Sequence, residues 1–322
     1  MNNKEIYQKT IGFSIRRLLW DIAAVLVLVI LTVGGFLLTE KFADAGLVGL
    51  GIGLIVGIIA VVIFMRYISY TYKAGQIAMM TKAVSEGSLP EDVISEGKKI
   101  VKERFITVAV YFAATKAIKG IFNQIGRAIT SVGDRIGGDT GSAIGSAIST
   151  VIQVIIRYLS DCCLGWVFFR KEVKATKATC EGAVLFFKHG KTLGKNMGRV
   201  FGMGLISLLL IGGAFTGIFY LIASGFPAVF AELAGEIGEL IKENPDIPQA
   251  LADTGTLMWV TAGLGGVILW SFIHSTFIRP FVLVGVLRNY IASGVDDIPT
   301  EASFDMLDNK SDKFRKLHAE LA

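Results

Sequence analysis

Two series of polar residues in the middle of the chain have the spacing of a single helical face. The first series consists of Thr107, Tyr111, Thr115, Lys119, Asn123 and Arg127. The second consists of Ser142, Ser146, Ser149, Gln153, Arg157 and Asp161. Because residues four apart lie one above the other on a helix, each series predicts a polar stripe. Two such stripes that face each other within a membrane would line a wet, net-positive path, which favours anionic or zwitterionic solutes.

The side chains expected to carry this chemistry are the titratable and long polar ones, and we refer to them as the polar path. They are Tyr111, Lys116, Lys119, Arg127, Gln153, Arg157 and Asp161. Arg157 and Asp161 are four residues apart and can form an ion pair. A charge at mid-bilayer costs about 2.5–3.5 kcal/mol, so Lys116 and Lys119 must face protein, water or headgroups. In a competing interpretation, residues 105–135 form an amphipathic helix in the headgroup region, and Arg157 snorkels from the end of a span.

The composition predicts the elements that would position these residues. Of the 322 residues, 52% are apolar and 18% are charged, whereas a soluble domain carries about 25% charged residues. Four uncharged runs, at 22–39, 45–65, 200–224 and 254–278, are long enough to cross a bilayer. We therefore expect an all-α fold, a polytopic helical membrane protein that forms one integral membrane domain over residues 1–322.

Charge asymmetry predicts the topology, because basic residues are retained on the cytosolic side of short loops. Segment 170–199 contains eight basic residues and two acids, whereas loop 232–253 contains six acids and one lysine. Segments 66–104 and 170–199, the tail 295–322 and the N-terminus are therefore predicted to be cytosolic, and loop 232–253 external.

The same argument constrains the middle of the chain, since residues 104 and 170 are both predicted to be cytosolic. The stretch between them must cross twice or not at all. Residues 140–156 carry no charge and are difficult to leave on a surface, which favours two crossings, at 105–122 and 141–165. The expected protein has about six spans, with both termini on the cytosolic side of the cell membrane.

The segments between the spans contain several local signals. Residues 1–21 are expected to form a separate amphipathic helix at the surface. The sequence Ser88-Leu89-Pro90-Glu91 resembles a capping box that starts a helix. Val93, Ile94, Gly97, Ile100 and Val101 give that helix one apolar face. Residues 231–242 predict an amphipathic helix with acids on one face.

Glycines in the second span predict close helix packing. Gly49, Gly53 and Gly57 are four residues apart and form a double G-x-x-x-G motif, in which another helix can pack backbone to backbone. The partner is either the first or last span of the same chain, or a second copy in a dimer.

Residue types that carry enzymatic or metal chemistry do not cluster in the sequence. Cys162, Cys163 and Cys180 form no C-x-x-C pair, and the three histidines are scattered. We expect no metal, no cofactor and no enzymatic activity. The basic segment 170–199 is predicted to contact anionic lipid headgroups rather than nucleic acid.

The C-terminal half of the chain contains short segments of a known pattern. These include Cys180, Ala183, Phe186, Phe187, Asn196, Arg199 and Val200, and the run Tyr220-Leu221-Ile222-Ala223-Ser224-Gly225-Phe226. With them, the chain from about Val151 onwards resembles the choline transporter-like family. The resemblance implies transport of choline or a similar organic cation, whereas the positive stripes disfavour a bare cation. Gly294-Val295-Asp296-Asp297 replaces the Asp-Gly tail signature of that family, and the chain has fewer spans.

Two functions follow as hypotheses. The first is a small-solute transporter or channel whose polar path lies between the third and fourth spans. The second is a non-transporting membrane scaffold, or a subunit of a larger membrane assembly, with the bilayer and a homo-oligomer or membrane partner as its contacts.

Overall fold

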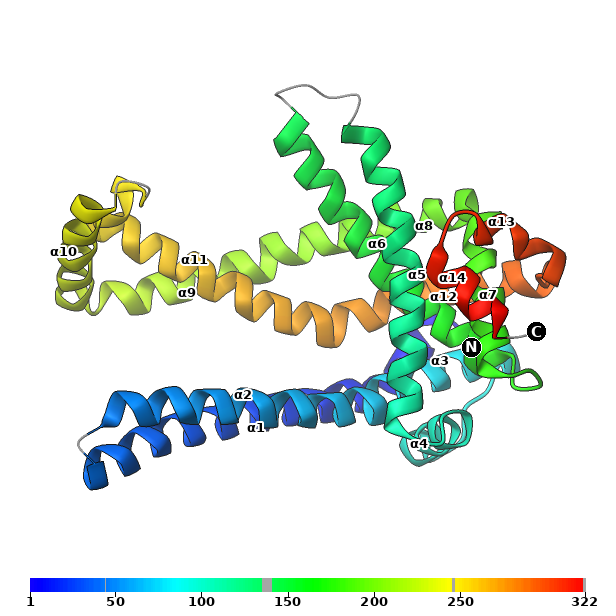
Figure 1. Ribbon diagram of the computed structural model, residues 1–322, viewed down its shortest axis with the longest axis horizontal. Helices are drawn as coiled ribbons and strands as arrows, with labels where there is room; N and C mark the ends of the chain where they lie inside the picture. Colours follow the sequence, from blue (N-terminus) through cyan, green and yellow to red (C-terminus); the bar gives the residue numbers. More distant parts are fainter. Residues whose placement is uncertain (44, 135–140, 245–246, 321–322) are drawn as a thin grey trace. The chain divides into compact units, whose positions relative to one another are not determined.

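The computed structural model describes the backbone of residues 1–43, 45–134, 141–244 and 247–320. Within these ranges the side chains at 43, 47, 69, 125–134, 141–152, 187, 190–197, 199, 243 and 301 lie outside the description. Every regular element of the described part is a helix (Figure 1). The chain divides into two compact units, Met1–Met197 with Leu283–Ala322, and Gly198–Val282.

The helices of the first unit form a long hairpin and a body. The hairpin consists of α1 (Asn3–Ala43) and α2 (Gly46–Ile68), and a π-helical turn, Ser69–Lys73, follows it. The body contains α3 (Ala74–Glu86), α4 (Val93–Arg104), α5 (Val108–Asp134), α6 (Gly141–Phe169), α7 (Ala175–Lys188), α13 (Asp305–Asp308), a 3-10 turn (Glu301–Ser303) and α14 (Asp312–Ala319). Two further helices, α8 (Gly190–Ser207) and α12 (Arg279–Asp296), belong partly to each unit.

The second unit is a shorter helical hairpin. Its two arms contain α9 (Gly213–Ser224) and α11 (Thr254–Ile273), with α10 (Pro227–Glu243) and a 3-10 turn (Gln249–Ala252) between them in the chain. Two π-helical turns, Leu208–Gly212 and His274–Ile278, precede α9 and follow α11.

Four helices of the described part are long and apolar enough to cross a membrane, namely those over Asn3–Phe42, Val48–Glu86, Val200–Ser224 and Thr254–Asp296. A fifth is counted only if α4 and the described part of α5, which meet at an 80° bend, form one span together. The chain is thus an all-α membrane protein, as the composition predicts. The six-span arrangement remains a prediction, because much of the predicted span 141–165 lies among side chains that are not described.

The first helix differs from its predicted form. Residues 1–21 do not make a separate surface helix, because α1 runs without a break from Asn3 to Ala43. No proline interrupts this stretch, and its polar residues have partners in the body. The amide of Gln76 in α3 donates hydrogen bonds to the Ser14 hydroxyl at 3.0 Å and to the Thr10 carbonyl at 3.3 Å.

The start of α4 also differs. Ser88 does not cap this helix, because Asp92 is its N-cap and accepts a hydrogen bond from the Ser95 amide at 3.0 Å. Pro90 disfavours helical backbone in the residue before it, which moves the start of the helix further along the chain. The predicted apolar face of α4 is confirmed, since Gly97, Ile100 and Val101 are buried.

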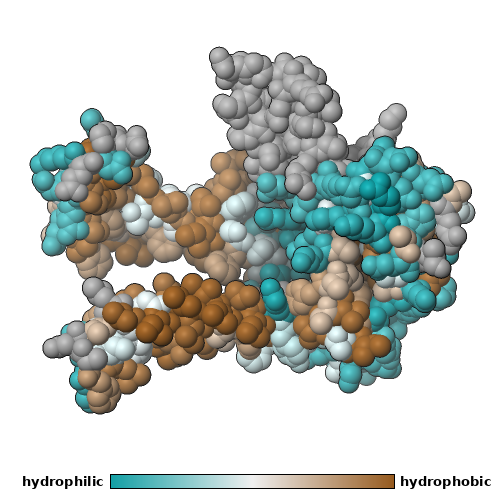
Figure 2. Space-filling model, in the orientation of Figure 1, coloured by the Kyte–Doolittle hydropathy of each residue, from teal (hydrophilic) through white to brown (hydrophobic). Residues whose placement is uncertain are grey.

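The surfaces of the hairpin and the body are of different character. Large apolar side chains along α1 and α2 are exposed, for example Ile30 at 66% and Ile63 at 64%. Figure 2 shows this hydrophobic surface along the hairpin, and hydrophilic residues over much of the body. The body has its own apolar core, to which Trp166, Tyr158 and Phe168 of α6 contribute fully buried side chains.

Candidate functional site

The predicted polar path is divided in the structure. Tyr111 and Asp161 are buried, whereas Lys116 and Lys119 are exposed. Gln153 and Arg157 are exposed on α6, which packs against α5, and the side chain of Arg127 lies outside the description. The structure thus places two of these residues in the protein core and four on the surface of neighbouring helices.

Asp161 forms a buried ion pair with a residue that the stripe pattern does not include. The Lys73 ammonium lies 2.7 Å from the Asp161 carboxylate, and the aspartate side chain is only 6% exposed. Lys73 ends the π-helical turn between α2 and α3. The pair therefore joins α6 to the junction between the hairpin and the body. The sequence pattern could not identify this partner, because the two residues are distant along the chain.

Tyr111 belongs to an aromatic cluster at the bend between α4 and α5. Its ring centroid lies 5.4 Å from that of Tyr70 and 5.5 Å from that of Phe105, both in edge-to-face geometry. The Tyr70 hydroxyl donates to the Phe105 carbonyl at 3.0 Å, and Phe105 also packs on Phe168 of α6 at 5.7 Å. This cluster holds the bend against the body, so Tyr111 supports the core.

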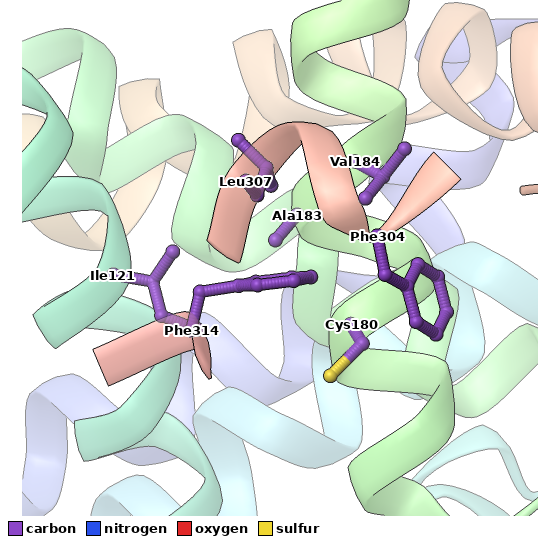
Figure 3. Packing of buried hydrophobic residues seen from close by; sticks show 7 residues of the cluster. All are labelled: Ile121, Cys180, Ala183, Val184, Phe304, Leu307 and Phe314. Carbon is purple, nitrogen blue, oxygen red and sulfur yellow. The ribbon is translucent and has the colours of Figure 1, made fainter. Parts of the chain in front are cut away.

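The apolar face of α5 is covered by α7 and the C-terminal tail. Ile118, Ile121 and Phe122 are at most 1% exposed. Figure 3 shows Ile121 of α5 beside Phe314 of α14, in a cluster that also holds Cys180, Ala183, Val184, Phe304 and Leu307. At the edge of this cluster, Gln124 of α5 accepts a hydrogen bond from the Ser311 hydroxyl at 2.9 Å. The first half of α5 is thereby part of the core of the body.

Cys180 is a packed thiol in this cluster. Burial raises its pKa to about 12, and the nearby carboxylate of Asp308 acts in the same direction. A thiol needs its thiolate form to act as a nucleophile or a metal ligand. Cys180 therefore contributes to the packing of this cluster.

A buried ion pair joins the middle of α7 to the residue that follows α6, and the end of α4 contacts the same region. Glu181 is 1% exposed and lies 3.0 Å from the Arg170 guanidinium, and it accepts a further hydrogen bond from the Trp166 indole at 3.1 Å. Arg104 of α4 donates to the carbonyls of Arg170 and Val173 at 3.0 and 2.8 Å. In the sequence, Arg170 and Glu181 are only two of the charges of a segment that is predicted to be cytosolic. Their contact could not be predicted, because it depends on how the helices pack.

The glycines of α2 lie against α1. A Cβ atom at Gly49 or Gly53 would collide with the backbone carbonyls of Gly35 or Leu31, respectively. At Gly57 it would lie 2.7 Å from a methyl group of Leu28. The spacing allows the first span, the last span or a second copy as the partner, and in the structure these glycines contact the first span of the same chain.

Aromatic and basic side chains surround the base of the α1/α2 hairpin. The Trp20 indole donates to the Tyr72 hydroxyl at 3.3 Å, and its ring packs edge-on against Phe64 at 5.3 Å. The Lys98 ammonium lies 4.9 Å from the centre of the Tyr72 ring, and Arg66 lies over Phe112 at 5.9 Å. Such a belt is typical of the boundary between membrane and water.

The hairpin of the second unit is held by polar and aromatic contacts. The Trp270 indole donates to the Ser207 hydroxyl at 3.0 Å, and Ser207 also lies 3.3 Å from a ring nitrogen of His274. Further along, the rings of Tyr220 and Trp259 stack at 4.1 Å. The predicted amphipathic helix is present as α10, with Lys242 and Glu239 paired at 2.7 Å on its exposed face.

Taken together, the contacts above hold helices in place, and the described residues contain no group of three or more His, Cys, Asp or Glu side chains that could hold a metal ion. Comparison with family models, with curated proteins and with solved structures gives no match.

Proposed function

We propose that the protein is a non-transporting membrane scaffold, or a subunit of a larger membrane assembly. In this proposal, two apolar helical hairpins anchor the chain in the cell membrane and present a folded helical body at the cytosolic face. The chain crosses the bilayer four times, with both termini in the cytosol.

The packing of α5 carries this proposal. A transport path between α5 and α6 requires α5 to cross the bilayer as a membrane helix. The apolar face of its described part is instead occupied by Cys180, Phe314 and the other cluster members from α7 and the C-terminal tail, shown in Figure 3. The tail and the basic segment 170–199, which contains α7, are both predicted to be cytosolic. With α5 in the body, the stretch between residues 104 and 170 does not cross the membrane. Segments 66–104 and 170–199 then lie on the same side, as their basic residues predict.

The exposed charges of α5 and α6 fit the same arrangement. Lys116 and Lys119 are exposed on α5, and Arg157 is exposed on α6. In hydrocarbon each such charge would cost about 2.5–3.5 kcal/mol, whereas at a cytosolic surface it costs little. The neighbouring basic segment 170–199 would then face anionic headgroups, with an attraction of about 1 kcal/mol for each Lys or Arg close to the surface.

The α1/α2 hairpin is suited to an anchoring role. The glycines of its double G-x-x-x-G motif, Gly49, Gly53 and Gly57, face α1 inside the hairpin. The outward faces therefore carry large apolar side chains, available to lipid or to apolar faces of partner helices. A homo-oligomer or a second membrane protein would bind in this region of the molecule.

Purification in a mild detergent with in-cell cross-linking tests the proposal. A scaffold or assembly subunit is expected to purify as a large homomeric particle or with stoichiometric partners. A strictly monomeric particle without partners, both in detergent and in cross-linked membranes, would overturn it.

Transport remains a second candidate function, favoured by the position of Lys119 and Arg157 on two adjacent helices. Flux of anionic and zwitterionic solutes into liposomes tests it, with Lys119→Ala and Arg157→Ala as variants. The scaffold proposal predicts no protein-dependent flux. Flux that either variant abolishes would establish the polar path and refute the scaffold.

A further inference from the structure

The body of the first unit has a pocket between α3, α4 and the end of α6. Its volume is about 290 Å³, close to the lower limit of small-molecule sites. The floor is apolar, with Ala78, Ile100 and Phe168 all less than 9% exposed. Phe169 continues this floor, and four charged residues form the rim: Lys82, Glu86, Lys171 and Glu172. None of these residues belongs to the polar path.

The rim is electrically balanced, since it carries two lysines and two glutamates. Glu86 lies between the two lysines, with its carboxylate oxygens 3.8 Å from the Lys82 ammonium and 3.9 Å from that of Lys171. Lys82 has a second acidic neighbour, Glu96, at 3.5 Å. A ligand with a net charge would upset this balance, whereas one that carries both signs would preserve it.

The two ion pairs of Glu86 are long, which makes them easy to exchange, whereas Glu172 of the rim pairs with Arg170 at 2.9 Å. Charge-assisted hydrogen bonds between nitrogen and oxygen measure about 2.7–2.9 Å, and the buried Lys73–Asp161 pair has this length, at 2.7 Å. The pairs of Glu86 are about 1 Å longer by this standard, and 59% of the Lys171 side chain is exposed. Exposed pairs of this kind contribute only about 0–1 kcal/mol each, so a ligand can replace them at little cost.

We propose that this pocket binds a small free zwitterion with an apolar side chain, of the class of an aliphatic or aromatic α-amino acid. The ligand carboxylate would pair with Lys171 or Lys82, and its ammonium would take the place of that lysine beside Glu86. Every charge that loses a partner in this exchange gains another. The apolar side chain would lie on Phe168 and Ile100, where it leaves water.

The position of Glu86 on the rim favours a soluble ligand over a lipid headgroup, while the floor residue Ile100 is two residues from Lys98 of the aromatic belt. Glu86 is the last residue of α3, and Tyr72 of the aromatic belt lies just before the start of that helix. The 13 residues of α3 separate the two by about 20 Å at 1.5 Å per residue. The site does not depend on the proposed scaffold role, and the two can fail separately.

Isothermal titration calorimetry on the full-length protein in detergent tests the inference, with L-leucine and L-phenylalanine as probes. We expect saturable binding of at least one. N-acetyl-leucine, which lacks the ammonium, and leucine amide, which lacks the carboxylate, should each bind at least ten-fold more weakly. Phosphoethanolamine serves as the headgroup probe and should bind no better than these two.

Variants connect the binding to the pocket. Lys171→Gln and Glu86→Gln should each weaken binding at least ten-fold, while Lys174→Gln, an exposed charge nearby that does not line the pocket, should leave it unchanged. Equal melting temperatures for all three variants would exclude unfolding as the cause. The inference is overturned by the absence of heat with both amino acids, by equal binding of N-acetyl-leucine, by preference for phosphoethanolamine, or by unchanged affinity in the two pocket variants.

Discussion

Replacement of Gly53 by alanine should separate the helices of the α1/α2 hairpin. The new Cβ atom would overlap the carbonyl oxygen of Leu31, and it would lie 3.0 Å from the carbonyl carbon of Leu31 and 3.1 Å from the Cα atom of Thr32. All three atoms belong to the backbone of α1 and cannot rotate away. Gly51 is the matched control, since a Cβ atom there meets nothing within 4 Å.

The magnitude follows from the separation that the alanine requires. Carbon atoms pack at about 3.5–4.0 Å, so the helices must move apart by roughly 0.5–1 Å, and a gap of that size removes a quarter to a half of each contact energy. If some 40 atom pairs, about as many as one buried leucine makes, each lose a third of about 0.15 kcal/mol, the loss is about 2 kcal/mol. Overpacked cores lose a similar amount, about 1–3 kcal/mol.

Titration with SDS of the protein in a mild detergent measures this loss. Trp20, which packs on Phe64 across the base of the hairpin at 5.3 Å, provides a local fluorescence signal once the other three of the four tryptophans are replaced by phenylalanine. We expect Gly53→Ala to lower the free energy of unfolding by about 2 kcal/mol, and Gly51→Ala to change it by less than about 0.5 kcal/mol. Equal effects of the two substitutions would refute the backbone contact between α1 and α2.

Three further predictions concern the body and the second unit. Because burial raises the pKa of Cys180 to about 12, N-ethylmaleimide at neutral pH should modify it only after unfolding, as measured by mass spectrometry; rapid modification of the native protein would contradict its burial. Glu181→Gln removes the buried carboxylate beside the Arg170 guanidinium, which keeps Glu172 at 2.9 Å as a second partner, and should destabilise the body by about 1.5–3 kcal/mol in a denaturant titration; a loss below about 1 kcal/mol would show that the pair is dispensable. Hydrogen bonds from Thr256 lower the pKa of Asp253, the N-cap of α11, so its contribution to stability is full above its unfolded value of about 3.9 and is lost as the pH falls through the lowered pKa. Asp253→Asn keeps a capping oxygen that does not titrate and should flatten the pH dependence of melting below about pH 4; an unchanged profile would assign the titration to other groups.

The sequence predicted the four long apolar helices, because an uncharged run of that length is typical of a helix that crosses a membrane. The spacing of Gly49, Gly53 and Gly57 likewise predicted a close helix contact. Patterns of this kind are local, because they depend on residues that lie within one or two helical turns of each other.

The sequence predicted the body poorly, because its contacts join distant segments. Tyr111 and Asp161 have the spacing of a polar stripe, yet they serve as core residues through Phe105 and Lys73. The tail was predicted as a polar cytosolic segment, and its few apolar residues, such as Phe314, gave no sign that they cover α5. A polar stripe on an amphipathic helix looks the same whether its other face meets lipid or protein.

Accessibility of cysteines on either side of sealed membrane vesicles is the most direct test of the central claim, that α5 belongs to the cytosolic body. Single cysteines would be placed at Lys119, at Lys313 in the tail and at Glu236 in α10, with the buried native cysteines replaced, and labelled with a membrane-impermeant maleimide. A cytosolic α5 predicts that Lys119→Cys and Lys313→Cys react from one side and Glu236→Cys from the other. Reaction of Lys119→Cys from the side of Glu236→Cys, or from neither side, would contradict it.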